Sequence, residues 1–181
     1  MKITASTLPG VLLIEPQIIT DERGLFCESF HAQRFSQLTG MSACFVQDNF
    51  SRSKRNVLRG LHYQIQNVQG KLVQVIEGEI FDVAVDLRRS SQHFGRWAGH
   101  TLSSTTRKQH WIPPGFAHGF LVTSASADVY YKTTSHYAPE YERSIRWNDP
   151  EIGIEWPFLS LPTLSKKDLV AAFLKDGEVF E

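Results

Sequence analysis

The residues best suited to chemistry stand in two short stretches of the chain. The first is residues 58–64, LRGLHYQ, with Lys71 shortly after it, and the second is residues 112–120, IPPGFAHGF. Each stretch places a histidine beside glycines, and the intervening length is enough for several strands to bring His62 and His118 into one barrel. Together they predict a ligand pocket that contains a base, a cation and a second imidazole.

Removing and returning a proton beside a carbonyl group needs residues of these kinds. The pKa of histidine lies near neutrality, so His62 suits the part of general base. A fixed ammonium group in a pocket of low dielectric constant can hold the charge of an enolate oxygen, which suits Lys71. A tyrosine hydroxyl, from Tyr130 or Tyr131, can return a proton from the opposite face and so invert the carbon. The set describes an epimerase or an isomerase that acts next to a ketone.

Each of these residues also has a purely structural interpretation. His62 can be a strand histidine that is hydrogen-bonded in the core, and Lys71 a solvated lysine at the start of a strand. Tyr130 or Tyr131 can be a packed aromatic residue of a sheet. Because histidine, lysine and tyrosine are common, their types alone do not decide between the two interpretations.

A period of two dominates the elements that must position these residues. Residues 80–87 carry apolar side chains on one face and two aspartates, Asp82 and Asp86, on the other, which is typical of a strand. Further strands are expected over 72–76, 119–123 and 129–134, with a turn at 77–79 and a first strand within 9–14.

Helix signals are confined to two places. One is residues 30–39, with Ser29 as N-cap and Gly40 as the stop, and the other is residues 166–175, with Ser165 as N-cap. The pattern predicts one domain over 1–181 that is mainly β. Its expected architecture is an antiparallel double-sheet jelly roll with a few short helices, including a C-terminal helical segment from about residue 165.

Composition narrows the range of partners. The chain has 181 residues with 19 basic and 19 acidic side chains, so nothing favours binding to nucleic acid or to an anionic membrane surface. Its two cysteines, Cys27 and Cys44, lack metal-ligand spacing and favour the reducing cytoplasm. The apolar run 9–14 is cut short by Glu15 and Pro16, so no signal peptide or membrane span is expected.

Histidines on the strands of a jelly roll raise the question of a metal, because most cupin barrels hold one through histidines and a glutamate. Residues 113–118, PPGFAH, resemble the second cupin motif. The place expected for the glutamate of the first motif holds Lys71, and no His-x-His pair precedes it. A protonated lysine repels a cation and offers it no lone pair. We therefore expect no metal.

Further motifs occur in a fixed order along nearly the whole chain. They are DERG at 21–24, QDN at 47–49, LRGLH at 58–62, GKLV at 70–73, FDVAVD at 81–86, the stretch 111–120, WNDP at 147–150 and LSKKD at 164–168. In order and spacing they closely resemble the dTDP-4-dehydrorhamnose 3,5-epimerase family. The resemblance implies a cofactor-free, cupin-like jelly-roll homodimer in the pathway to dTDP-L-rhamnose. It also implies inversion of C3 and C5 of dTDP-4-dehydro-6-deoxy-D-glucose, which gives dTDP-4-dehydro-L-rhamnose.

The resemblance implies catalytic roles for individual residues. The general base falls on His62, polarised by the carboxylate of Asp168, and the proton donor falls on Tyr131. Lys71 matches the lysine that stabilises the enolate. Asp168 has a competing role, since it can also close a capping box with Ser165 at the start of the last helix.

The nucleotide end of such a substrate needs arginine forks for its diphosphate and an aromatic platform for its base. The resemblance implies diphosphate contacts from Arg23 and Arg59, stacking by Phe26 and Tyr137, and a contact from Glu28 to the base. His118 matches an imidazole that lines the sugar site, although it can also be a structural remnant of the cupin motif. Further implied substrate contacts are Gln47, Asp48, Asn49, Lys71, Glu142 and Lys167.

Other functions stay open at this point. The same type of sugar nucleotide could be the substrate of a single-carbon epimerase or of a 3,4-ketoisomerase. A sugar-binding cupin without activity would not need His62 and Tyr131 on opposite faces of the sugar. A metal-dependent cupin oxygenase would need the ligand set that this sequence lacks.

Overall fold

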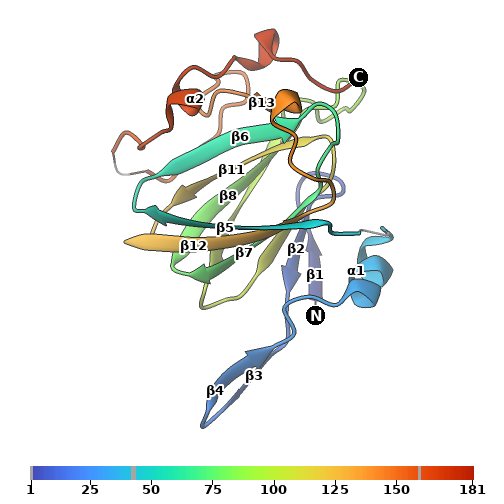
Figure 1. The fold of residues 1–181 in the computed structure, drawn as a ribbon, viewed down its shortest axis with the longest axis vertical. Coiled ribbons are helices and arrows are strands. Elements are labelled where there is room, and N and C mark those ends of the chain that lie inside the picture. The colour runs from blue at the N-terminus through green and yellow to red at the C-terminus, as the bar shows by residue number, and fades with distance from the viewer. Residues whose placement is uncertain (1, 42–43, 159) are drawn as a thin grey trace.

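The computed structural model describes residues 2–41, 44–158 and 160–181 and is built mainly of antiparallel strands (Figure 1). In chain order these are β1 (Lys2–Ala5), β2 (Leu12–Glu15), β3 (Ile18–Asp21), β4 (Gly24–Cys27), β5 (Gln47–Lys54), β6 (Leu58–Gln64), β7 (Lys71–Glu77), β8 (Glu79–Asp86), β9 (Trp97–Ser103), β10 (Gln109–Ile112), β11 (Phe116–Val122), β12 (Ser126–Thr133) and β13 (Glu142–Ser144). The helices are α1 (Ala32–Thr39) and α2 (Lys166–Leu169), with 3-10 turns η1 (Pro139–Tyr141) and η2 (Leu174–Asp176).

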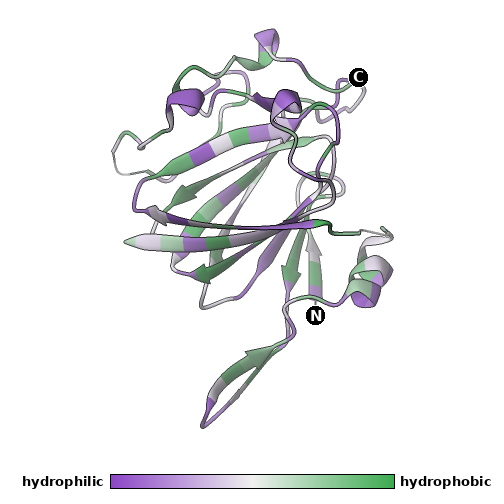
Figure 2. Ribbon diagram, in the orientation of Figure 1, coloured by the Kyte–Doolittle hydropathy of each residue, from purple (hydrophilic) through white to green (hydrophobic). Residues whose placement is uncertain are grey.

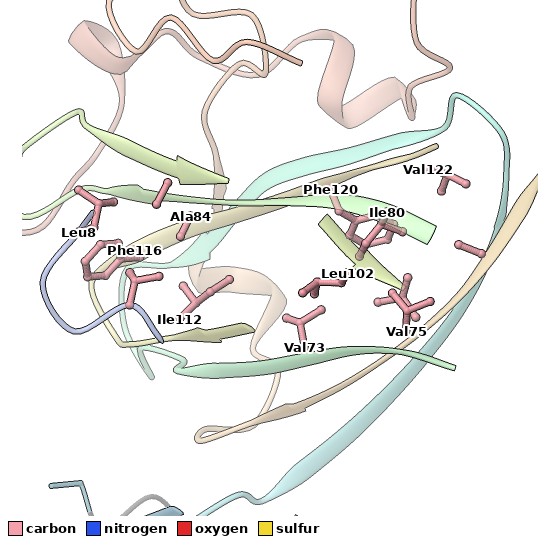
Figure 3. Close-up of a cluster of buried hydrophobic side chains, with 14 residues drawn as sticks. Leu8, Val73, Val75, Ile80, Ala84, Leu102, Ile112, Phe116, Phe120 and Val122 are labelled. Atoms are coloured by element: carbon pink, nitrogen blue, oxygen red, sulfur yellow. The ribbon is translucent and has the colours of Figure 1, made fainter. Parts of the chain in front are cut away.

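Two sheets face each other and confirm the predicted double-sheet architecture. The six-stranded sheet has the order β1-β2-β10-β7-β12-β5, and the five-stranded sheet has the order β13-β6-β11-β8-β9. Between them lies an apolar core to which both sheets contribute, for example Val73 and Val75 from β7 and Ile80 and Phe120 from the opposite sheet (Figure 3). Burial of this surface, at about 25 cal/mol per Å², holds the two sheets together.

The predicted alternation along β8 is confirmed, and both of its faces are buried. Val83 and Val85 pack outward against the C-terminal part of the chain, in a second apolar cluster. Ile80 and Ala84 point inward to the core between the sheets. Asp82, which belongs by its parity to this inner face, is fully buried inside the barrel.

A bulge in the pairing of β6 with β11 changes which residues of β6 face inward. His62 pairs with His118, but the next pair joins Arg59 to Phe120, so β6 has one residue more than β11 between them. At this point a Cβ on Gly60 would lie 2.5 Å from the Cα of Gly119, and Gly60 has a φ of +139°. Glycine is needed there. The extra residue lets Arg59 and His62, three positions apart, share one face.

The ends of several elements differ from the sequence predictions. The first strand is β1, whereas the run 9–14 contains a turn and then the start of β2. Helix α1 is capped by His31 rather than Ser29, although Gly40 ends it in the left-handed conformation as expected. Helix α2 ends at Leu169 because the next segment joins a strand-like pairing, in which Arg146 N–H donates to the carbonyl of Ala172.

The hairpin formed by β3 and β4 extends away from the barrel (Figure 1). Figure 2 shows hydrophobic residues along it although it is not covered. Its large exposed side chains are Ile18, Ile19, Leu25 and Phe26, and Phe26 is 68% exposed. Apolar side chains in such numbers on a projecting hairpin indicate a surface that packs against something else.

Within residues 2–41, 44–158 and 160–181, no helix is long and apolar enough to cross a membrane.

Candidate active site

A cavity collects side chains from both sheets and from the segment between β12 and β13. Arg59, His62, Lys71, His118, Tyr131 and Glu142 are among the side chains that line it. The strands β6, β7, β11 and β12 each contribute at least one of them. Residues that the sequence analysis selected from distant positions are therefore brought together.

His62 is held by a buried carboxylate. Its Nε2 lies 2.6 Å from Oδ1 of Asp168, and the Asp168 side chain is only 2% exposed. Burial alone would raise the pKa of Asp168, but the hydrogen bond and the charge of His62 outweigh it and lower that pKa. An ionised Asp168 accepts a hydrogen bond from Nε2–H, so Nδ1 is the nitrogen of His62 that remains free to act as a base.

Lys71 is buried at the start of β7, with 7% of the residue exposed. Its Nζ donates a hydrogen bond to the backbone carbonyl of His62, 3.3 Å away. Burial lowers the pKa of Lys71 to about 8, although the negative charges of Asp82 and Glu142 oppose that change. A positive charge kept at neutral pH in such a site interacts strongly with a negative charge formed next to it.

His118 belongs to a buried group that the sequence analysis missed. Its Nε2 lies 2.7 Å from Oδ1 of Asp82, and the other oxygen of Asp82 lies 2.7 Å from Nδ1 of His110. Burial would raise the pKa of Asp82, but the two imidazoles lower it to about 2. The sequence held one signal for the place of Asp82: the alternation along β8 puts it on the face opposite the apolar one.

The two neighbouring tyrosines of β12 lie on opposite faces of the sheet. Tyr131 lines the cavity, with its ring centroid 6.5 Å from that of His118. Burial raises its pKa, so the phenol is protonated at neutral pH. Tyr130 instead lines a depression on the outer face of the six-stranded sheet, together with Phe30 and Lys132. Residue type alone did not distinguish the two tyrosines, whereas the structure places only Tyr131 at the cavity.

At the rim of the cavity, Glu142 joins two further predicted residues. One of its carboxylate oxygens accepts a hydrogen bond from the Tyr137 hydroxyl at 2.9 Å, and the other accepts one from Nζ of Lys167 at 2.5 Å. Gln47 accepts a hydrogen bond from the backbone N–H of Tyr137 and donates one to Asn49. This network ties the start of β5 to the rim.

Seven of the predicted substrate contacts do not line this cavity. Gln47, Asn49 and Lys167 belong to the network at its rim, and the other four lie elsewhere. Asp48 points away from it, as its parity in β5 requires, and pairs with Lys132. Glu28 pairs with Arg34, next to α1. Arg23 and Phe26 are on the projecting hairpin, where they line a separate shallow surface.

Within the described residues, no group of three or more histidine, cysteine, aspartate or glutamate side chains is arranged to hold a metal ion.

Known proteins are similar to this chain in sequence and in fold. A sequence model of the dTDP-4-dehydrorhamnose 3,5-epimerase family matches residues 5–176. The dTDP-4-dehydrorhamnose 3,5-epimerase of Pseudomonas aeruginosa is 53% identical to this chain over 180 residues, which cover 99% of each sequence.

Two solved structures bear on the choice of reaction. The dTDP-6-deoxy-D-glucose-3,5-epimerase of Legionella pneumophila, in complex with dTDP-4-keto-L-rhamnose, has a TM-score of 0.95 and 52% identity, covering 97% of this chain and 93% of that one. A 3′-monoepimerase of Streptomyces bikiniensis, in complex with dTDP-quinovose, has a TM-score of 0.88 and 34% identity, covering 93% of this chain and 86% of that one.

Proposed function

We propose that this chain, which belongs to the dTDP-4-dehydrorhamnose 3,5-epimerase family, inverts both C3 and C5 of dTDP-4-dehydro-6-deoxy-D-glucose. It is an isomerase, and the proposal concerns its exact substrate, its catalytic residues and its assembly. The observation that carries the proposal is the convergence of the His62–Asp168 pair, Lys71 and Tyr131 on one cavity. The product, dTDP-4-dehydro-L-rhamnose, would serve the synthesis of dTDP-L-rhamnose.

The first step is proton removal by His62. Its Nδ1 takes the proton from the carbon next to the C4 ketone, and the electron pair of the C–H bond moves into the enolate. The buried carboxylate of Asp168 stabilises the imidazolium that results and fixes the ring in the required tautomer. Because C3 and C5 both flank C4, one base can serve the two carbons in turn.

Lys71 stabilises the negative charge that develops on the C4 oxygen. Its ammonium is buried and anchored on the backbone of His62, so it need not reorganise during the reaction. His118 lines the same cavity but is a poorer cation, because burial lowers its pKa. We therefore assign the enolate charge to Lys71 and a contact with the sugar to His118.

Tyr131 returns a proton to the carbon from the other face. Burial raises the pKa of its hydroxyl, which keeps the donor protonated until the enolate is formed. Protonation from the face opposite His62 inverts the carbon, whereas protonation by His62 itself would restore the starting sugar.

The diphosphate and the base need contacts that one chain does not complete. Arg59 lines the cavity, with its Nε donating to the hydroxyl of Ser53. Arg23 and Phe26 lie on the hairpin that projects from the barrel, and its apolar side chains are exposed. We propose a homodimer in which each hairpin packs against the partner and supplies these two residues, and Glu28 near them, to the partner's cavity.

We further propose that the enzyme works in the cytoplasm. Its cysteines, Cys27 and Cys44, form no disulfide, as is usual in a reducing compartment.

One NMR experiment tests the reaction. The 4-keto sugar nucleotide is incubated with the enzyme in deuterated water, with and without a chelator, and C3 and C5 are followed separately. The proposal expects deuterium and inversion at both carbons, unaffected by the chelator. Exchange and inversion at one carbon alone would make the chain a mono-epimerase, a reaction that this fold supports in the Streptomyces relative. A shift of the ketone from C4 to C3 would indicate a 3,4-ketoisomerase, and loss of activity with the chelator would indicate a metal.

A further inference from the structure

His110 is a fully buried histidine to which the proposed reaction gives no role. It lies on β10 and is not among the side chains that line the cavity. Its Nδ1 is bonded to Asp82, while its Nε2 is buried without a hydrogen-bond partner among the described residues. Buried polar atoms are seldom left unpaired, so this arrangement calls for an explanation.

The geometry fixes the tautomers of two imidazoles. A carboxylate only accepts hydrogen bonds, so each oxygen of Asp82 must receive an N–H: Nδ1–H from His110 and Nε2–H from His118. In His118 this leaves Nδ1 for a ligand in the cavity. In His110 it leaves Nε2 as a bare lone pair, which costs less to bury than a charged imidazolium with an unpaired N–H.

We propose that His110 is a positioning residue, which acts through Asp82 to keep His118 neutral and correctly turned toward the sugar. That the ligand of His118 is a sugar rests on the function proposed above. The His110–Asp82–His118 arrangement does not depend on that function. His110 saturates the second oxygen of Asp82, so that the carboxylate cannot turn toward another donor.

The charges around His118 support this role. Asp82 on β8 and His110 on β10 lie behind it. The cavity is also lined by its cross-strand partner His62 and Arg59 on β6, Lys71 on β7, Tyr131 on β12 and Glu142 on β13. With His110 neutral, the negative charges of Asp82 and Glu142 stand against the positive charges of Lys71 and Arg59 around the cavity. A cation at His118 would compete with Lys71 for the enolate oxygen. It would also lower the pKa of Lys71 further.

A third imidazole, that of His100, lies against His110. The ring of His100 meets that of His110 edge-on at 4.9 Å, and Nε2 of His100 lies 3.1 Å from the Ser6 hydroxyl. Burial lowers the pKa of His100 to about 4, so it is neutral as well. Lys108 is the positive charge that acts on His100 from this side, and it is paired with Glu15 at 2.9 Å. Neither His100 nor His110 then carries a charge that compensates Asp82.

The test follows the imidazole of His118 by ¹⁵N NMR across pH, without substrate, in wild type and in two variants. His110→Leu removes the donor to Asp82, so Asp82 interacts more strongly with His118, and the titration midpoint of His118 should rise by about one pH unit. His110→Asn carries an amide N–H near the position of Nδ1 and should keep the wild-type midpoint. The midpoint of His62, which is bonded to Asp168, serves as the internal control.

An unchanged His118 midpoint in His110→Leu would overturn the inference. If that variant does not fold, His110→Gln replaces it, because glutamine carries its amide to the position of Nε2 and loses the bond to Asp82; it should move the midpoint upward. A kinetic readout complements the titration: kcat should fall about tenfold in His110→Leu and recover in His110→Asn, with little change in KM. Since the NMR measurement uses no substrate, absence of epimerisation would overturn the proposed function and leave this inference standing.

Discussion

The Asp168 carboxylate lies 2.6 Å from Nε2 of His62, although 106 residues separate them in the chain. The backbone N–H of the same aspartate donates to the hydroxyl of Ser165, 3.1 Å away, at the start of α2. The sequence left open whether Asp168 caps the helix or assists the histidine. Its backbone takes part in the cap while its side chain binds His62, so α2 positions the carboxylate.

Asp168→Asn should lower kcat by about two to three powers of ten, because an amide neither fixes the reactive tautomer nor stabilises the imidazolium. Stopped assays of product formation at saturating substrate measure this. Ser165→Ala is the matched control: loss of the cap should cost about 1 kcal/mol of stability and leave kcat within a few-fold of wild type. A near-normal kcat in Asp168→Asn would mean that His62 acts without the pair.

The same pair gives a dependence of stability on pH. The folded-state pKa of Asp168 is lowered, so the unfolded chain binds a proton to it more readily than the folded chain. The stabilising contribution is present above the unfolded value of 3.8 and is lost as pH falls through the lower folded value. The free energies of unfolding of wild type and Asp168→Asn, measured by denaturant titration, should therefore converge at low pH. A difference between them that stays constant with pH would contradict this account.

His62→Asn should abolish deuterium exchange at both C3 and C5, a loss on the order of a thousandfold or more, since one base serves both carbons. Tyr131→Phe should act differently. It should permit exchange but impair inversion, because the proton is removed and returned on the same face. Tyr130→Phe, on the outer face of the sheet, is the control and should leave both unchanged. Full inversion by Tyr131→Phe would assign the donor to another group or to water.

The sequence predicted the parts of the fold that depend on local patterning. The alternation in β8, the turn at Gly78 and the end of α1 at Gly40 follow from side-chain periodicity and from glycine conformations, and the structure confirms them. Helix α2 is shorter than predicted because its continuation pairs with Arg146, a residue far away in the chain. Such a pairing leaves no local signal.

The candidate site shows the same division. The residues on regular positions of β6, β7, β11 and β12 converge as the sequence analysis expected. The inward turn of Arg59 depends on the bulge at Gly60, and the role of Asp82 depends on two histidines from other strands. Neither could be read from spacing, because each is created by contacts between strands.

Lys71→Met should lower kcat by about two to three powers of ten and change KM much less, because the ammonium acts mainly in the transition state. The variant should at the same time be more stable by about 1–3 kcal/mol at neutral pH, since it no longer buries a charge. Both quantities are measured on one preparation, by steady-state kinetics and by denaturant unfolding. If only KM rises, Lys71 is a binding residue.

The wild-type enzyme should also respond to pH through Lys71. Its folded-state pKa of about 8 lies below the ordinary lysine value of 10.5, so kcat/KM should fall as pH rises through about 8. Between these two values the unfolded chain binds the proton and the folded chain does not, so this residue's contribution to stability should increase with pH. In Lys71→Met that increase should be absent, and its persistence would exclude Lys71 as the cause.

The proposed exchange of hairpins predicts that two inactive variants restore each other. Arg23→Ala combined with Phe26→Ala damages only the hairpin, and His62→Asn damages only the cavity. In a mixed dimer, the intact cavity of the first chain receives the intact hairpin of the second, so one of the two sites is complete. Activity should return to about half of the wild-type value per mixed dimer after unfolding and refolding the two variants together. If each hairpin served its own cavity, every site would carry one defect, and the mixture would stay as inactive as its components.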